Sequence, residues 1–162
     1  MGTWLDNDGL YHKYGTTKTT ANVAGEFQTL GALREIEVKL DLTTLTSSAV
    51  IISDVTFFPK MRIEEVVIEV QTAATSSGTG TLDVGLIKTD RTTEIDYNGL
   101  IAAETTADLD TAGKKITYIY GTSKAGALIG TTTTSVGHIT ANYNTGAFQA
   151  GVVYIRIRYR HD

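Results

Sequence analysis

Hydrophobic and polar residues alternate with a period of two along much of the chain. In residues 33–42, Ile36, Val38, Leu40 and Leu42 fall on one face, while charged residues fall on the other. Successive side chains of a strand point to opposite faces, so this pattern predicts a half-buried strand. The same reasoning, with the abundance of β-branched residues, predicts strands at 33–42, 49–58, 61–72, 81–89, 114–121, 135–143 and 152–160.

These strands are predicted to form an antiparallel β-sandwich or jelly roll. Turn signals recur about every ten residues and separate roughly seven or eight strands, which is typical of all-β sandwiches. The T-S-S-G-T-G turn at 75–80 predicts that 61–72 and 81–89 form a hairpin. The connection 93–113 alternates poorly, so at most one short helix is expected in it, over 97–104. We therefore predict one all-β domain over residues 32–162.

The first 31 residues differ from the rest of the chain. They contain Trp4, Tyr11 and Tyr14 and are interrupted by glycines, which disfavours a helix or a long strand. The segment is also too aromatic for a typical disordered tail. We therefore interpret residues 1–31 as an extended N-terminal arm that lies on its own domain or on a neighbouring chain.

Composition narrows the classes of function. The chain has 162 residues, no cysteine and a formal net charge of −4. Without cysteine there is no disulfide, no thiolate metal site and no cysteine nucleophile. A negative net charge provides no basic field for nucleic acid, whose binding depends on neutralising phosphates. No apolar run approaches the ~18 residues that span a bilayer, so neither nucleic acid nor a membrane is an expected partner.

No group of residues forms a recognisable catalytic or metal site. His12, His138 and His161 are not spaced as metal ligands, and His138 is expected on the polar face of its strand. The D-N-D-G segment at 6–9 resembles the start of a calcium loop but lacks the later ligands, which favours an Asx-turn. No serine lies in a nucleophile elbow, and no carboxylate pair stands out. We therefore expect no catalytic residue, cofactor or metal, and predict a non-enzymatic protein.

Three arginines, Arg156, Arg158 and Arg160, share one face of the last predicted strand. Like charges at this spacing repel each other unless carboxylates lie between them. The natural partners within the domain are the outward acids of the strands 33–42 and 61–72, namely Glu35, Glu37, Glu65 and Glu69. The alternative is a contact with another subunit or partner, since the arginine fork binds carboxylates bidentately. Both interpretations stay open at this point.

Several segments carry a family resemblance. W-L-D-N-D-G-L-Y-H-K-Y-G (4–15) and G-E-F-Q-T-L-G-A-L-R-E-I-E-V (25–38) resemble the beginning of a group of tailed-bacteriophage virion proteins. The resemblance spans most of the chain and continues through T-A-A-T-S-S-G-T-G-T-L-D-V-G-L (72–86), D-R-T-T-E-I-D-Y-N-G-L-I-A-A (90–103) and A-G-A-L-I-G-T (125–131). These motifs are structural and specify no chemistry. The group is similar to capsid decoration, or cement, proteins.

This resemblance implies a jelly-roll protein that sits as an oligomer on the outside of the phage head. The implied partners are the major capsid protein, whose subunits it bridges, and further copies of the chain in a dimer or trimer. The implied location is the virion. In several such proteins extended terminal arms do part of the bridging, so the implied anchors are Trp4, Leu5, Leu10, Tyr11, Tyr14 and Phe27.

Two other functions stay open. A tail-fibre, head-fibre or baseplate module would bind a host-surface glycan, and an aromatic platform in the 93–113 connection, such as Tyr97, would favour that function. A β-sandwich hydrolase would need a catalytic set that no group of residues in the sequence supplies.

Overall fold

The computed structural model describes residues 2–5, 10–14, 28–29 and 33–161, and for the first three stretches it describes the backbone alone. The chain divides into two compact units, Met1–Leu33 and Arg34–Asp162. The first unit contains a small antiparallel sheet in the order β1-β2-β3, made of β1 (Gly2–Leu5), β2 (Leu10–Tyr14) and β3 (Gln28–Thr29). These strands are short, as expected of a segment interrupted by glycines.

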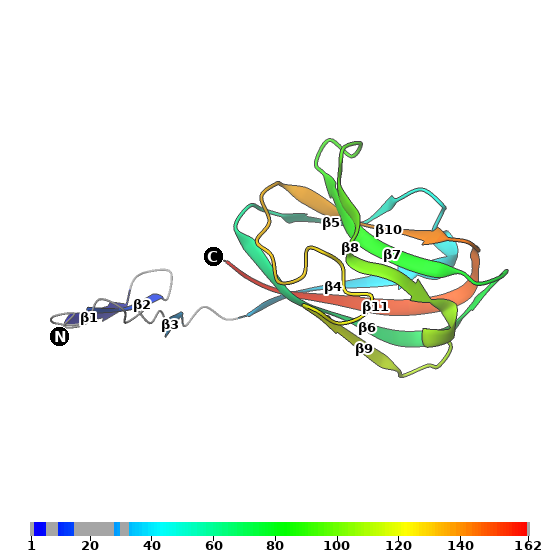
Figure 1. Cartoon of the computed structure of the whole chain (residues 1–162), viewed down its shortest axis with the longest axis horizontal. Helices are drawn as coiled ribbons and strands as arrows, with labels where there is room; N and C mark the ends of the chain where they lie inside the picture. Colours follow the sequence, from blue (N-terminus) through cyan, green and yellow to red (C-terminus); the bar gives the residue numbers. More distant parts are fainter. Residues whose placement is uncertain (1, 6–9, 15–27, 30–32, 162) are drawn as a thin grey trace. The chain divides into compact units, whose positions relative to one another are not determined.

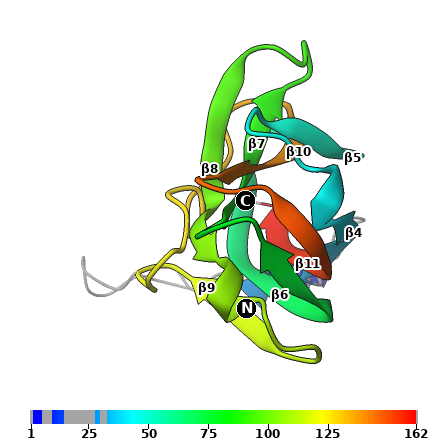
Figure 2. The same ribbon diagram turned by 90° about the vertical axis from the view of Figure 1, so that its right-hand side faces the viewer.

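The second unit consists of two four-stranded antiparallel sheets, which Figures 1 and 2 show from two directions. The first sheet has the order β4-β11-β6-β9, with β4 (Arg34–Asp41), β11 (Phe148–His161), β6 (Met61–Ser76) and β9 (Lys115–Ile119). The second sheet has the order β5-β10-β7-β8, with β5 (Val50–Phe57), β10 (Gly137–Asn144), β7 (Thr81–Lys88) and β8 (Glu94–Thr105). The predicted all-β sandwich is confirmed.

In the second unit the first strand in the sequence pairs with the last, the second with the last but one, and so on toward the middle. β4 pairs with β11, β5 with β10, β6 with β9, and β7 with β8. The unit is therefore one long hairpin rolled into two sheets, which is the topology of a jelly roll. The predicted hairpin of 61–72 with 81–89 is wrong, because β6 and β7 lie in different sheets and β6 pairs with β9 and β11.

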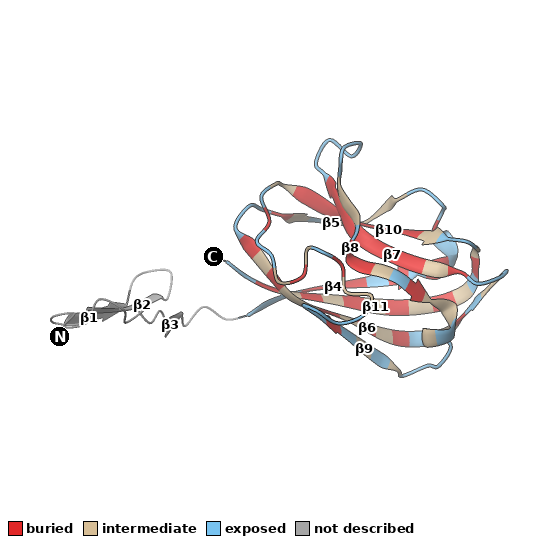
Figure 3. Cartoon of the chain, viewed as in Figure 1, coloured by how far each residue is buried: buried red, intermediate tan, exposed pale blue. Residues whose placement is uncertain are grey.

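The core lies between the two sheets and follows the alternation of the sequence. Along β11 the inward residues Val153, Ile155 and Ile157 are fully buried, and their outward neighbours are partly exposed, as the banding of Figure 3 shows. The predicted inward residues of 33–42 are buried in the same way. Phe148, which starts β11, also packs in the core. Period two was therefore a reliable guide to the first sheet.

Residues 94–105 form strand β8, so the predicted helical turn over 97–104 is wrong. Leu100 and Ile101 are adjacent in sequence and both fully buried, and the pairing of β8 with β7 shifts register three times. Ala103 has a positive φ of 55°, which adds to the irregularity. Bulges of this kind interrupt the alternation of a strand, and they explain why its period is hidden in the sequence. A short 3-10 turn, η2 (Thr106–Asp108), follows β8.

The beginning of β8, the edge strand of the second sheet, lies very close to its neighbours β7 and β10. A Cβ atom on Gly85 would lie 2.0 Å from the carbonyl oxygen of Asp96, and one on Gly137 would lie 2.6 Å from the Cδ1 atom of Ile95. The close approach is possible because glycine leaves room there. His138, predicted on a polar surface, is only 9% exposed.

Candidate interaction surfaces

The three arginines of β11 form an ion-pair ladder on the outer face of the first sheet. Arg156 Nε donates to Glu37 of β4 at 2.6 Å, and its Nη1 donates to Glu69 of β6 at 2.6 Å. Arg158, two residues further along β11, makes the same two contacts: its Nε donates to Glu35 of β4 at 2.7 Å, and its Nη1 donates to Glu65 of β6. The antiparallel register sets this pattern, because Arg156 lies opposite Glu37 and Arg158 opposite Glu35.

The ladder extends to Arg160, whose Nε lies 2.8 Å from Glu64 Oε1. Pairing within the domain, one of the two interpretations that the sequence left open, is therefore observed for Arg156 and Arg158. Glu69 and then Glu37 raise the pKa of Arg156, and Arg156 followed by Lys115 lowers the pKa of Glu69. Exposed ion pairs contribute little stability each, so the ladder mainly neutralises this face.

A second charged cluster is partly buried and joins β8, η2, β9 and the connection after β9; Glu104 and Tyr118 are its buried members. Glu104 is 1% exposed, accepts a hydrogen bond from the Tyr118 hydroxyl at 2.6 Å, and accepts another from Lys124 Nζ at 3.1 Å. Lys124 Nζ also donates to Asp108 at 2.5 Å, and the Thr105 hydroxyl donates to the same carboxylate oxygen at 2.6 Å. Each charge in the cluster thus has an opposite charge within hydrogen-bond distance.

The electrostatics of this cluster indicate a structural role. Burial raises the pKa of Tyr118, and the hydrogen bond to Glu104 raises it further, so the phenol stays neutral and donating. Lys124 and then Thr105 lower the pKa of Asp108, which keeps that carboxylate ionised. In the part of the chain that the structure describes, no three or more His, Cys, Asp or Glu side chains are placed to hold a metal. The cluster fastens the two sheets together at one end.

Sequence reasoning missed this cluster. Glu104 and Asp108 were two acids among many, and Lys124 carried no distinguishing signal. The partners of Glu104 lie 14 and 20 residues further along the chain, a spacing that matches no helical or strand period. Only the jelly-roll topology brings the residues together.

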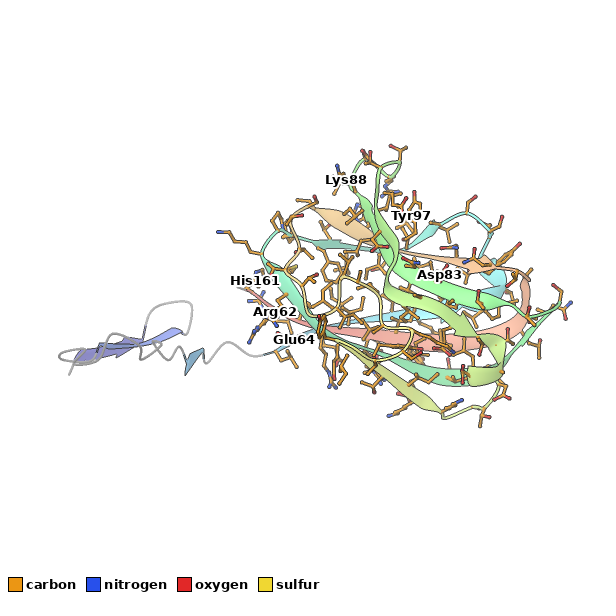
Figure 4. All side chains as sticks on the ribbon, viewed as in Figure 1. Arg62, Glu64, Asp83, Lys88, Tyr97 and His161 are labelled. Atoms are coloured by element: carbon orange, nitrogen blue, oxygen red, sulfur yellow. The ribbon has the colours of Figure 1, made fainter. Side chains whose placement is uncertain are left out.

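An exposed apolar patch lies at the β9 edge of the first sheet. Ile119 is 47% exposed and Tyr120, just past the strand, is 79% exposed, whereas the preceding Tyr118 is buried. The two residues border a depression of about 660 Å³ together with Arg62 and Glu64, whose Nε and Oε1 atoms are 3.4 Å apart. Figure 4 shows these two side chains next to each other on β6. Edge strands with exposed apolar residues favour contacts with other chains.

The predicted anchors of the arm fall mostly on described backbone. Trp4 and Leu5 are in β1, and Leu10, Tyr11 and Tyr14 are in β2; the backbone pairing sets Leu5 opposite Tyr11 and Trp4 opposite His12. The side chains of these residues, the D-N-D-G segment and the predicted anchor Phe27 lie outside what the structure describes. In the described residues, no helix has the length and apolar character required to cross a bilayer.

Comparison with known proteins places the fold. No protein-family model matches the sequence, and no curated protein matches it. A chain of the structure "Capsid of Ralstonia phage GP4" is similar, with a TM-score of 0.53 and 16% identity over 91% of this chain and 92% of that chain. A chain of "Cyanophage Pam1 capsid asymmetric unit" has a TM-score of 0.54 and 14% identity over 91% of this chain and 98% of that one. The fold of this chain is thus shared with chains found in two phage capsids.

Proposed function

We propose that this chain is a bacteriophage head decoration protein. It binds the outer surface of the assembled capsid, bridges subunits of the major capsid protein, and stabilises the shell against the pressure of packaged DNA. The observation that carries the proposal is the shared fold over 91% of the chain with chains of two phage capsid structures. The virion-protein resemblance of the arm and of the 72–86 and 90–103 segments supports it. The protein acts in the virion, as a homo-oligomer, without catalysis.

The proposed mechanism is selective binding to one state of the head. A protein that binds the assembled lattice and not its separated subunits stabilises the lattice by mass action, by about 2.7 kcal/mol per site at a hundred times Kd. Repetition over the lattice and oligomerisation add multivalency, so modest contacts at each site are sufficient. The jelly-roll unit, with its own core and satisfied charges, serves as the rigid part of this clamp.

We propose that the arm supplies the main contacts. Aromatic side chains dominate the binding energy of protein interfaces, and Trp4, Tyr11 and Tyr14 are concentrated in the arm. Leu5, Leu10 and Phe27 complete the anchor set. The arginines of the ladder contribute at the rim, because the side chains of Arg158 and Arg160 keep 42% and 47% of their surface exposed while Arg156 keeps 25%.

The test is attachment to expanded, undecorated phage heads. The full chain is expected to co-sediment with the heads and to raise their resistance to heat. A variant lacking residues 1–31 is expected to keep the far-ultraviolet spectrum of a folded β domain but to lose most of its attachment. The point variants Trp4→Ala and Tyr11→Ala test the anchors, with Tyr154→Ala on the outer face of β11 as the matched control. Absence of co-sedimentation by the full chain would overturn the proposal.

A further inference from the structure

A polar groove lies on the outer face of the second sheet, whereas the arginine ladder lies on the first sheet. Its volume is about 460 Å³, within the range of small-molecule sites. The lining comes from four separate regions of the sequence: Ser47 before β5, Asp83 on β7, Asn142 on β10, and Glu94, Tyr97 and Asn98 on β8. Asp83 and Tyr97 both lie on the β7–β8 side of the unit (Figure 4).

The groove exists because β8 bends over the sheet. Gly85 has no side chain at the point where the Asp96–Tyr97 backbone passes, so the backbone approaches closely. The N–H group of Tyr97 donates to Glu94 Oε1 at 3.2 Å, and that of Asn98 donates to Asp96 Oδ1 at 3.2 Å. These bonds hold the segment that carries Tyr97, whose side chain is half-buried at the wall of the groove.

Two buried polar side chains form the floor of the groove. Asp83 is 7% exposed; its Oδ1 atom accepts the N–H of Ala103 at 2.6 Å and its Oδ2 atom accepts the amide of Asn144, so the carboxylate is fixed in orientation. Asn142 is 8% exposed, and its Oδ1 atom has no hydrogen-bond partner among the described residues. Buried polar atoms without partners are rare and cost stability, so a water molecule or a ligand in the groove is expected to complete the bonding of Asn142.

The chemistry of the lining favours a neutral polyol. Amide, hydroxyl and carboxylate groups line the same groove as one aromatic ring. The hydroxyl groups of a polyol would find both donors and acceptors there, and the ring would pack against the polyol's C–H groups. The carboxylates of Asp83 and Glu94 repel an anionic ligand. A calcium ion needs about six to eight oxygen ligands, and among the described residues no three or more His, Cys, Asp or Glu side chains are placed to hold a metal. We infer that this groove binds a neutral glycan, with one sugar stacked on Tyr97 and its hydroxyls bonded to Asn142, Asp83 and Asn98.

The inference is independent of capsid attachment, and its test uses the full chain in the absence of heads. The probes are glucose, galactose, mannose and N-acetylglucosamine in amide NMR titrations, followed by an array of neutral and sialylated glycans. At least one neutral sugar is expected to shift the amide signals of residues 83, 97, 98 and 142. Tyr97→Ala is expected to weaken this binding at least about tenfold.

The control is Tyr154→Ala, which removes a half-buried tyrosine from the opposite sheet and is expected to bind the sugar as the wild type does. Because Tyr97 is only half-buried, its replacement is expected to leave the thermal midpoint nearly unchanged. The inference is overturned if no neutral sugar or array glycan binds, or if binding is equal in the wild type and Tyr97→Ala. Signals that respond only to sialylated glycans or to calcium also overturn it.

Discussion

Replacing Tyr118 by phenylalanine tests whether the cluster around Glu104 fastens the two sheets together. The substitution keeps the ring and deletes the hydroxyl that donates to Glu104 at 2.6 Å. Tyr118 is 2% exposed and Glu104 1%, so water does not replace the lost donor freely. A hydrogen bond to a charged group contributes about 1.5–3 kcal/mol, and Lys124 still compensates the carboxylate, so we expect a loss of about 2 kcal/mol. Urea unfolding at neutral pH measures this difference.

The difference in unfolding free energy between the wild type and Tyr118→Phe is expected to depend on pH. The pKa of Tyr118 is raised in the folded state by burial and by Glu104, whereas the unfolded tyrosine titrates near pH ~10. The stability that Tyr118 contributes is therefore fully present below pH ~10 and is lost above it by about 1.4 kcal/mol per pH unit. The phenylalanine variant lacks this dependence, so its deficit is expected to shrink as the pH rises above 10.

Tyr154→Phe is the matched control, because the contact of Tyr154 uses its ring, with Lys39 Nζ 5.8 Å from the ring centroid. This variant is expected to unfold at the urea concentration of the wild type. Equal stability of Tyr118→Phe and the wild type at neutral pH would refute the proposed role of the hydroxyl. A deficit that stays constant from neutral to alkaline pH would show that the phenol of Tyr118 is not held neutral.

Three further changes probe other parts of the fold. Lys124→Met leaves Glu104 buried without its cation and is expected to cost about 3 kcal/mol in urea unfolding, at the low end of the range because the Lys124 side chain is 30% exposed. Lys115→Met is the control and is expected to cost much less, because the Lys115 side chain is 60% exposed in its ion pair with Glu69. Arg156→Met is expected to lower the thermal midpoint at low ionic strength, and the difference from the wild type should disappear in molar salt. Gly85→Ala places a Cβ atom 2.0 Å from the carbonyl oxygen of Asp96 and is expected to lower the free energy of unfolding by about 3 kcal/mol. Gly78→Ala is the control and is expected to leave it nearly unchanged, because nothing lies within 4 Å of its Cβ position.

The first sheet was predictable because each of its main strands alternates cleanly. A period of two determines which residues face inward, and charge complementarity then matches the arginines of β11 to the glutamates of its neighbours. The local signal is weaker for the second sheet. There the outward residues Asp83, His138 and Asn142 are polar yet buried, so a polar position does not indicate exposure, and β8 contains register shifts that hide its period.

Neither the pairing of strands nor the groove could be predicted from the sequence, and the reason differs from that for the second sheet. Both depend on which strands lie side by side, and hydrophobic patterns within a strand carry no information about its neighbours. The T-S-S-G-T-G turn at 75–80 looked like that of a hairpin, yet the chain passes there from one sheet to the other. Tyr97 was recognised only as an aromatic in a long connection; its position beside Asp83 and Asn142 follows from the bend of β8 over Gly85.

The position of β11 also has a consequence for biosynthesis. This strand sits inside the first sheet, between β4 and β6, although both of those strands leave the ribosome much earlier. Until residues 148–161 emerge, β4 and β6 each present an open edge with no partner between them, and such edges template aggregation. Pairings across so much sequence also fold slowly. A chain cut before β11 is therefore expected to be captured by chaperones or proteases, which restricts the supply of folded subunits to chains that contain the whole of this strand.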